Sequence, residues 1–102
     1  MSPVARPSSH NTLIVAARHH QAVIYTAAAS GAFIQAPIDS EVYVKLPLIL
    51  KESLPEDQKH YVCRLNKALY GLKQSPKLWF ARAKSTLLAN GYKQNPHDKC
   101  LF

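Results

Sequence analysis

The spacing of apolar residues along the chain predicts a helix near the N-terminus. This helix is expected over residues 12–21, because apolar residues recur there at helical spacing and Asn11 can cap the first turn. The preceding segment, residues 1–11, carries prolines and serines without apolar periodicity, so we expect it to form a loose arm. Residues 12–102 are then expected to form the folded unit.

A second helix is predicted over residues 76–90. Ser75 is a favoured N-cap residue, and Pro76 suits the first helical position because its missing N–H would have no helical partner there. Gly91 can adopt the left-handed conformation that often ends a helix. The expected apolar face of this helix consists of Trp79, Phe80, Ala83 and Leu87.

Short runs rich in β-branched and aromatic residues predict a small sheet. Residues 22–25 (AVIY) are expected to form a buried strand, and residues 61–65 (YVCRL) a short one. The alternation in 41–47 (EVYVKLP) indicates a half-exposed strand that ends at its proline. The polar segment 51–60 is expected to be a surface loop, and 99–102 (KCLF) the beginning of a further strand. Two helices with a small sheet indicate an α+β fold.

The composition fits one small globular domain. The chain has 102 residues, of which 47% are hydrophobic, and no apolar run approaches the ~20 residues that a membrane span requires. The first residues include no apolar stretch of the kind found in secretory signals. Cys63 and Cys100 lie far apart and are expected to be reduced thiols at half-buried strand positions. We therefore expect a cytoplasmic or nuclear protein that is not secreted and has no membrane partner.

The net charge of +7 lies entirely in the C-terminal part of the chain. Residues 1–60 contain five Lys/Arg and five Asp/Glu, which cancel, whereas residues 61–102 contain eight Lys/Arg and one acid, Asp98. Such asymmetry favours a polyanionic partner such as nucleic acid. The alternative is a solvated basic face without a partner, and composition alone leaves both interpretations open.

The run LYGLKQSPKLWF, residues 69–80, places a glycine, a lysine and a serine just before the second helix. Gly71 permits a backbone turn and lets another group approach the main chain closely. Lys73 is then expected beside the N-terminal end of the helix, where free N–H groups and the positive end of the helix dipole suit a phosphate. The other interpretation is a plain loop-to-helix cap with an exposed lysine, and the spacing alone favours this one.

The same run resembles the L-Y-G-L-K-Q-S/A-P signature, followed by an aromatic pair, of reverse transcriptases from Ty1/copia-type retrotransposons. AFIQAPIDSEVYVKLP is similar to a segment of that family that begins A-F-L and contains E-V-Y. LLANGYKQNPHDKCLF resembles another segment, which ends D-x-C-L-F. The resemblance covers residues 12–102 without a gap.

The resemblance implies a partial right-hand polymerase, made of the fingers and the front of the palm, with helices packed on one face of a sheet. It implies that Tyr70, Gly71 and Lys73 line the pocket of the incoming nucleotide. The implied partner is an RNA or DNA template–primer. The residues expected to contact its backbone are Lys67, Lys73, Lys77 and Lys84.

The chain departs from the family at a catalytic position. The family's first metal-binding Asp lies five residues before the Phe of its A-F-L pattern, and counting back from Phe33 gives Ala28. Alanine cannot bind Mg²⁺, and the nearest acid, Asp39, lies on the far side of the motif. The family's other two metal-binding acids would follow Phe102. Magnesium is thus implied for intact family members, but no cofactor, catalytic residue or metal ligand is expected in these 102 residues.

The leading interpretation is a truncated, catalytically inactive remnant of such an RNA-directed DNA polymerase. A second is a small basic nucleic-acid-binding module retained from a transposon. A third is a module that docks on a polymerase chain, or associates with itself, through exposed sheet edges. A zinc site is not expected at His10, His19 and His20, because adjacent helical residues such as the last two point about 100° apart and no Cys or carboxylate cluster matches them. No serine lies in the pattern of a hydrolase nucleophile elbow.

Overall fold

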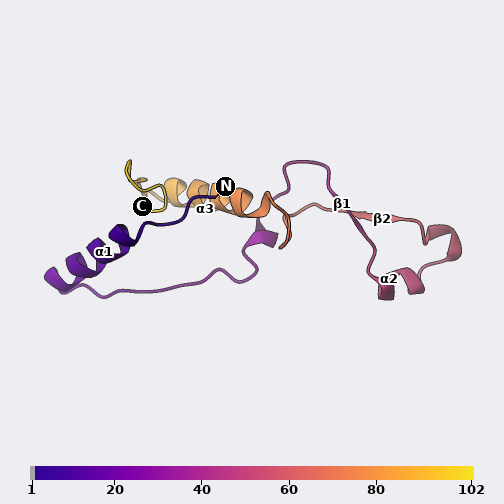
Figure 1. Cartoon of the computed structure of the whole chain (residues 1–102), viewed down its shortest axis with the longest axis horizontal. Coiled ribbons are helices and arrows are strands. Elements are labelled where there is room, and N and C mark those ends of the chain that lie inside the picture. The colour runs from indigo at the N-terminus through magenta and orange to yellow at the C-terminus, as the bar shows by residue number, and fades with distance from the viewer. Residues whose placement is uncertain (1) are drawn as a thin grey trace.

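The computed structural model describes residues 2–102, which form three α-helices, two 3₁₀ helices and one two-stranded antiparallel sheet (Figure 1). In chain order the elements are α1 (Pro7–His19), η1 (Phe33–Gln35), β1 (Tyr43–Lys45), α2 (Leu48–Ser53), η2 (Glu56–Gln58), β2 (Val62–Arg64) and α3 (Ser75–Ala89). This combination agrees with the expected α+β class, with one α-helix more than predicted. No helix of the described residues is long and apolar enough to cross a membrane.

The elements are spread along one axis instead of surrounding one core. The helix α1 lies at one end of the molecule, and the β1–β2 hairpin with α2 lies at the other (Figure 1). The Cα radius of gyration is 19.6 Å, whereas a compact domain of this length would have about 13 Å. Ala36 and Ala68 are the buried apolar residues of the described chain. Because so little apolar surface is buried, we expect a free energy of unfolding below the ~5 kcal/mol that is usual for a native domain.

A backbone crossing between residues 36–38 and 66–68 forms the centre of the structure. The Ala68 N–H donates to the Ala36 carbonyl at 2.9 Å, and the Ile38 N–H donates to the Asn66 carbonyl at 3.2 Å. Pro37 and Lys67 form an isolated antiparallel bridge between these bonds. The small side chains of the two alanines let the segments approach each other, so this crossing joins η1 to the segment that leads into α3.

The two-stranded sheet confirms the strands that were predicted within residues 41–47 and 61–65, which lie on either side of α2. Tyr43 pairs with Arg64, Val44 with Cys63 and Lys45 with Val62. The middle pair is half-buried and the outer pairs are exposed, which confirms the expected alternation. Cys63 is a half-buried strand thiol, also as expected.

The segment between the strands is only partly a loop. Residues 51–60 were expected to be irregular, but α2 continues to Ser53 and η2 spans Glu56–Gln58. Pro47, which ends the strand region, is also the N-cap of α2, and its carbonyl accepts the Lys51 N–H at 2.9 Å. The prediction of a surface position is confirmed, because these residues are exposed or half-buried.

The helix α1 begins at Pro7, five residues before the predicted start, and it therefore includes part of the expected arm. Asn11 lies inside the helix and does not cap it. Pro7 occupies the first helical position, where a proline is tolerated, and the preceding Arg6 is the N-cap. The reason for the early start is a carboxylate from the other end of the chain, described below.

Two predicted strands are absent from the described structure. Residues 22–25 are extended but unpaired, and Tyr25 is 88% exposed where a buried strand was expected. No backbone hydrogen bond joins residues 23–29 to another described segment, so the β-branched residues produce an extended chain without a sheet. Residues 99–102 form a loop instead of a strand, in which the Asn95 N–H donates to the Leu101 carbonyl at 2.7 Å.

The helix α3 confirms the second helix prediction within one residue at each end. Its C-terminus is closed as expected: Gly91 has a φ of +89° and donates to the Leu88 carbonyl, while Tyr92 donates to the Leu87 carbonyl. The start differs, because Gln74 is the N-cap and Ser75 is the first helical residue. Ser75 has another function, which defines the candidate site.

Candidate nucleic-acid interface

The loop before α3 is closed by the buried hydroxyl of Ser75. Ser75 is fully buried, and its Oγ donates a hydrogen bond to the Leu69 carbonyl, six residues earlier. The same carbonyl accepts the Leu72 N–H at 3.4 Å. The serine thus holds residues 69–75 in a compact turn, and it does not cap the helix as the sequence predicted.

Gly71 allows the sharp turn at the tip of this loop. Its φ of +97° lies in a region that residues with side chains rarely adopt. A Cβ at this position would meet no heavy atom within 4 Å, so the need for glycine comes from the backbone and not from crowding. The open space also leaves the main chain accessible to another molecule.

The residues proposed for a nucleotide pocket lie on this loop. The Tyr70 ring packs against Phe33 of η1 with the ring centroids 4.6 Å apart, although the tyrosine remains 61% exposed. Lys73 is exposed on the other side of Gly71. The structure therefore places Tyr70, Gly71 and Lys73 together at the surface, with the aromatic contact fixing the loop against η1.

The expected group of free N–H donors beside Lys73 is not what the structure shows. The Ser75 N–H donates to the Leu72 carbonyl at 3.3 Å, and Pro76 has no N–H. Two of the first three positions of α3 therefore offer no donor to a phosphate. The helix start therefore offers an anion fewer backbone donors than expected, and the exposed Lys73 and Lys77 side chains provide the positive charge.

The four lysines expected to face nucleic acid are all at least partly accessible. Lys77 and Lys84 lie seven residues apart on one face of α3, which is about 10 Å along a helix. Lys77 is exposed and Lys84 is half-buried. Lys67 is exposed at the central crossing, so it lies apart from the α3 pair and near the base of the loop.

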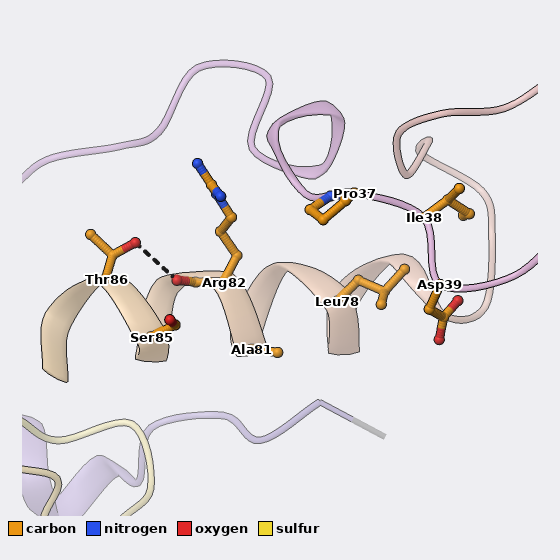
Figure 2. A pocket seen from close by; sticks show the side chains of 8 residues that line it. All are labelled: Pro37, Ile38, Asp39, Leu78, Ala81, Arg82, Ser85 and Thr86. Atoms are coloured by element: carbon orange, nitrogen blue, oxygen red, sulfur yellow. Dashed lines mark hydrogen bonds between the residues drawn. The ribbon is translucent and has the colours of Figure 1, made fainter. Parts of the chain in front are cut away.

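Beside the crossing, α3 and residues 37–39 enclose an open groove of about 450 Å³. Figure 2 shows the Leu78 and Arg82 side chains on the side of α3 that faces Pro37 and Ile38, which line the other wall of the groove. The Thr86 Oγ1 donates to the Arg82 carbonyl at 3.0 Å within the helix. Sequence reasoning did not identify this groove, since its walls come from residues 37–39 and 78–86, which are far apart along the chain.

Ala28, the residue expected at the position of the family's first metal-binding Asp, offers no ligand for a metal ion. Ala28 lies in the extended, exposed segment before η1, and its methyl group has no oxygen to offer Mg²⁺. Asp39 is exposed on the other side of η1. No group of three His, Cys, Asp or Glu residues that could hold a metal ion exists within residues 2–102.

Asp98, the acid of the basic half, was not recognised from the sequence as a structural residue. Only 5% of it is exposed, and its Oδ2 accepts hydrogen bonds from the Ser9 hydroxyl and from the Arg6 N–H at 3.0 Å. Its Oδ1 accepts the Cys100 N–H at 2.9 Å. The bond from Ser9, followed by those from the two N–H groups, lowers the pKa of Asp98 to about 2.

These bonds place a carboxylate at the N-terminus of α1, which explains why the helix begins at Pro7. We call the arrangement of Arg6, Ser9 and Asp98 the N–C clasp. Beside it, burial and the Asp98 charge raise the pKa of the Cys100 thiol, which is half-buried in a loop and not in the strand expected. A cysteine thiol with a raised pKa is protonated at neutral pH and is a poor nucleophile.

A family profile described as reverse transcriptase (RNA-dependent DNA polymerase) matches residues 1–102. The chain is similar to the Retrovirus-related Pol polyproteins from transposons RE2 and RE1 of Arabidopsis thaliana, with 34% and 33% identity. It is 30% identical to the Retrovirus-related Pol polyprotein from transposon TNT 1-94 of Nicotiana tabacum. Each comparison covers 99% of this chain but only 7% of the relative. No solved structure matches the chain.

Proposed function

Because the chain belongs to the reverse transcriptase (RNA-dependent DNA polymerase) family of copia-type retrotransposons, we propose that it contributes part of the fingers and palm of such an enzyme. In this role its basic half holds the backbone of an RNA or DNA template–primer. The chain spans about 7% of the length of the curated relatives it matches, so the proposal concerns what these residues contribute and not the activity of a whole polyprotein.

The proposal rests mainly on one observation: residues 61–102 have no exposed acidic side chain that could balance their positive charge. Their one acid, Asp98, is buried; it accepts hydrogen bonds from Arg6 and Ser9 in the N–C clasp and from the Cys100 N–H. Of the eight cations, Arg64 is 3.4 Å from Glu41, an acid of the other half. Lys73 and Lys77 have no ion-pair partner among the described residues. A surface with such an excess of positive charge attracts phosphates and releases their counterions on binding.

The loop of Tyr70, Gly71 and Lys73 is proposed to face the incoming nucleotide. Its support is the exposed lysine next to an open backbone turn, held in place by the Phe33 contact. An ammonium on a flexible stem can follow a triphosphate, and a glycine without neighbours lets the substrate approach the main chain. Because Ala28 offers no metal ligand, we assign no catalytic step to these residues.

The experiment that tests the proposal is binding of a labelled RNA–DNA hybrid at several salt concentrations, followed by fluorescence anisotropy. We expect Lys73→Gln/Lys77→Gln to reduce the slope of log affinity against log salt by about 1.8, since each phosphate contact contributes about 0.9 in a duplex. The matched control is Arg6→Gln/Arg18→Gln, which removes two charges from the neutral half. Arg6 contributes its backbone N–H to the N–C clasp, and a glutamine retains this group. Equal losses in both variants would refute a specific basic face.

A further inference from the structure

A second basic site lies in the half of the chain whose formal charges cancel. At the outer end of the hairpin, β1, α2 and the segment leading into β2 surround a cavity of about 360 Å³. Residues that line it and carry the argument are Lys45, Lys51, Lys59, His60, Tyr61 and Val62. We call this the hairpin pocket. None of its lining residues is acidic, so it is locally positive although the surrounding sequence is neutral.

The three ammonium groups of the hairpin pocket differ in whether they form an ion pair. The Lys59 Nζ is 2.8 Å from the Glu56 Oε1, which fixes one cation at the wall. Lys45 and Lys51 are exposed and have no ion pair with any described residue. Three cations on separate elements around one cavity can surround a single anionic group, and two of them are available for it.

An aromatic surface adjoins these cations. The rings of His60 and Tyr61 meet edge to face, with their centroids 4.8 Å apart. This contact orients Tyr61, which remains 54% exposed. Aromatic rings next to cations are the combination that binds single-stranded nucleic acid, because bases stack on the ring while the phosphates contact the cations.

The same chemistry continues along the hairpin. Lys45 is paired with Val62 across the two strands, and the next pair on that face is Tyr43 with Arg64. Tyr43 is 53% exposed. This face of the sheet therefore carries two cations, Lys45 and Arg64, and one exposed ring, Tyr43; Arg64 lies 3.4 Å from Glu41, which leaves Lys45 as its unpaired cation.

We propose that the hairpin pocket binds one phosphate and its adjoining base in a single-stranded nucleic acid that runs along this face of the β1–β2 hairpin. A duplex fits less well, because its bases are stacked on each other and cannot reach Tyr61. The inference deepens the proposed function and rests on it for the class of partner. It assigns a strand contact to residues outside the basic half.

The first test is binding of labelled oligothymidylate of about ten nucleotides, a length within known single-strand site sizes. With the two unpaired lysines, Lys45 and Lys51, each adding about 0.7 to the slope of log affinity against log salt, the affinity should fall about sevenfold between roughly 50 and 200 mM salt. Lys45→Gln/Lys51→Gln removes both contributions, so this sevenfold factor should be lost from the salt dependence of its binding, because the Lys59 ammonium is paired with Glu56. Both lysines are exposed, and an unchanged far-UV circular dichroism spectrum shows that the variant folds.

The second test separates this site from the basic half. Backbone amide resonances of His60 and Tyr61 should shift on addition of oligothymidylate in the natural chain and in Lys73→Gln/Lys77→Gln, but not in Lys45→Gln/Lys51→Gln. Tyr61→Ala should weaken binding about tenfold by removing the stacking surface, whereas Tyr61→Phe should keep the affinity within about twofold. Unshifted His60 and Tyr61 resonances in the natural chain would overturn the inference.

Competition identifies the kind of ligand. Free dTTP and inorganic tripolyphosphate should displace the oligonucleotide only at much higher concentrations. Displacement by dTTP at equal concentration would overturn the assignment to a strand and indicate a free-nucleotide site. If Lys73→Gln/Lys77→Gln does not change the salt slope of hybrid binding while the His60 and Tyr61 resonances shift as expected, the proposed function is wrong and the hairpin pocket is supported. If the salt slope changes as expected but the resonances do not shift, only the hairpin pocket is refuted.

Discussion

Replacing Ser75 with alanine tests whether the loop before α3 depends on one buried hydroxyl. The substitution removes the hydrogen bond from the Ser75 Oγ to the Leu69 carbonyl. That carbonyl keeps only the long bond from the Leu72 N–H at 3.4 Å, which is weak at this distance. The alanine methyl fits the space of the serine, so the loss is of hydrogen bonding and not of packing.

The magnitude follows from the burial of the site. A net hydrogen bond contributes about 0.5–1.5 kcal/mol, and leaving the partly buried Leu69 carbonyl poorly satisfied adds to the cost. Alanine favours helix over serine by about 0.5 kcal/mol, which acts in the opposite direction. We expect Ser75→Ala to lower the free energy of unfolding by about 1–2 kcal/mol, which is a large part of a small total.

The assay is urea unfolding followed by Trp79 fluorescence, because this residue lies on α3 next to the loop. The matched control is Ser85→Ala, a change of the same kind at an exposed position of the same helix. Ser85→Ala should leave the stability unchanged or raise it slightly. If Ser75→Ala were as stable as Ser85→Ala, the buried hydroxyl would not hold the loop and the reasoning would fail.

Three further outcomes follow from the structure. The pKa of Asp98 is lowered from 3.8 to about 2 in the folded state, so the unfolded state binds more protons between these values and stability rises with pH there. Acid titration of the unfolding free energy should therefore show the natural chain more stable than Asp98→Asn above about pH 4 and equal to it below about pH 2. Gly71→Ala should destabilise the chain by about 1 kcal/mol in urea unfolding, from backbone strain at φ +97° alone, since no atom crowds the new methyl. Neither the natural chain nor Ala28→Asp should incorporate nucleotide in a primer-extension assay with Mg²⁺ or Mn²⁺, because one added carboxylate supplies few of the oxygens that Mg²⁺ requires; incorporation above a no-protein blank would contradict this.

The elements that the sequence predicted well have local signals. The helix α3 follows from Pro76 at its start and Gly91 at its end, and the hairpin follows from the alternation around Val44. The early start of α1 could not be predicted, because its N-terminus is satisfied by Asp98, 92 residues from Arg6. The extended segment 22–25 has the residues of a strand, but residues far from it decide whether a partner strand is present.

The candidate site also has some features that a local sequence signal predicts and others that it does not. The exposure of Lys73 and Lys77 follows from the charge of their region, and the structure confirms it. The role of Ser75 was wrongly predicted, because a serine before a helix usually caps it and here it reaches back to Leu69. The hairpin pocket was missed because its lysines are spread over a segment whose acids cancel their charge in any count along the sequence.

The N–C clasp docks α1 on Asp98 through an intramolecular contact, so the docking can be treated as binding of a tethered ligand. No residue of α1 is buried, and the clasp bonds of Arg6 and Ser9 hold its first turn to Asp98. The tether is the exposed extended segment 22–29, and its length sets the effective concentration of the helix at the carboxylate. Doubling a flexible tether of this kind lowers the ratio of docked to undocked helix about threefold. The fraction of time that α1 spends docked is thus set by spacer length, without any change in the residues that touch.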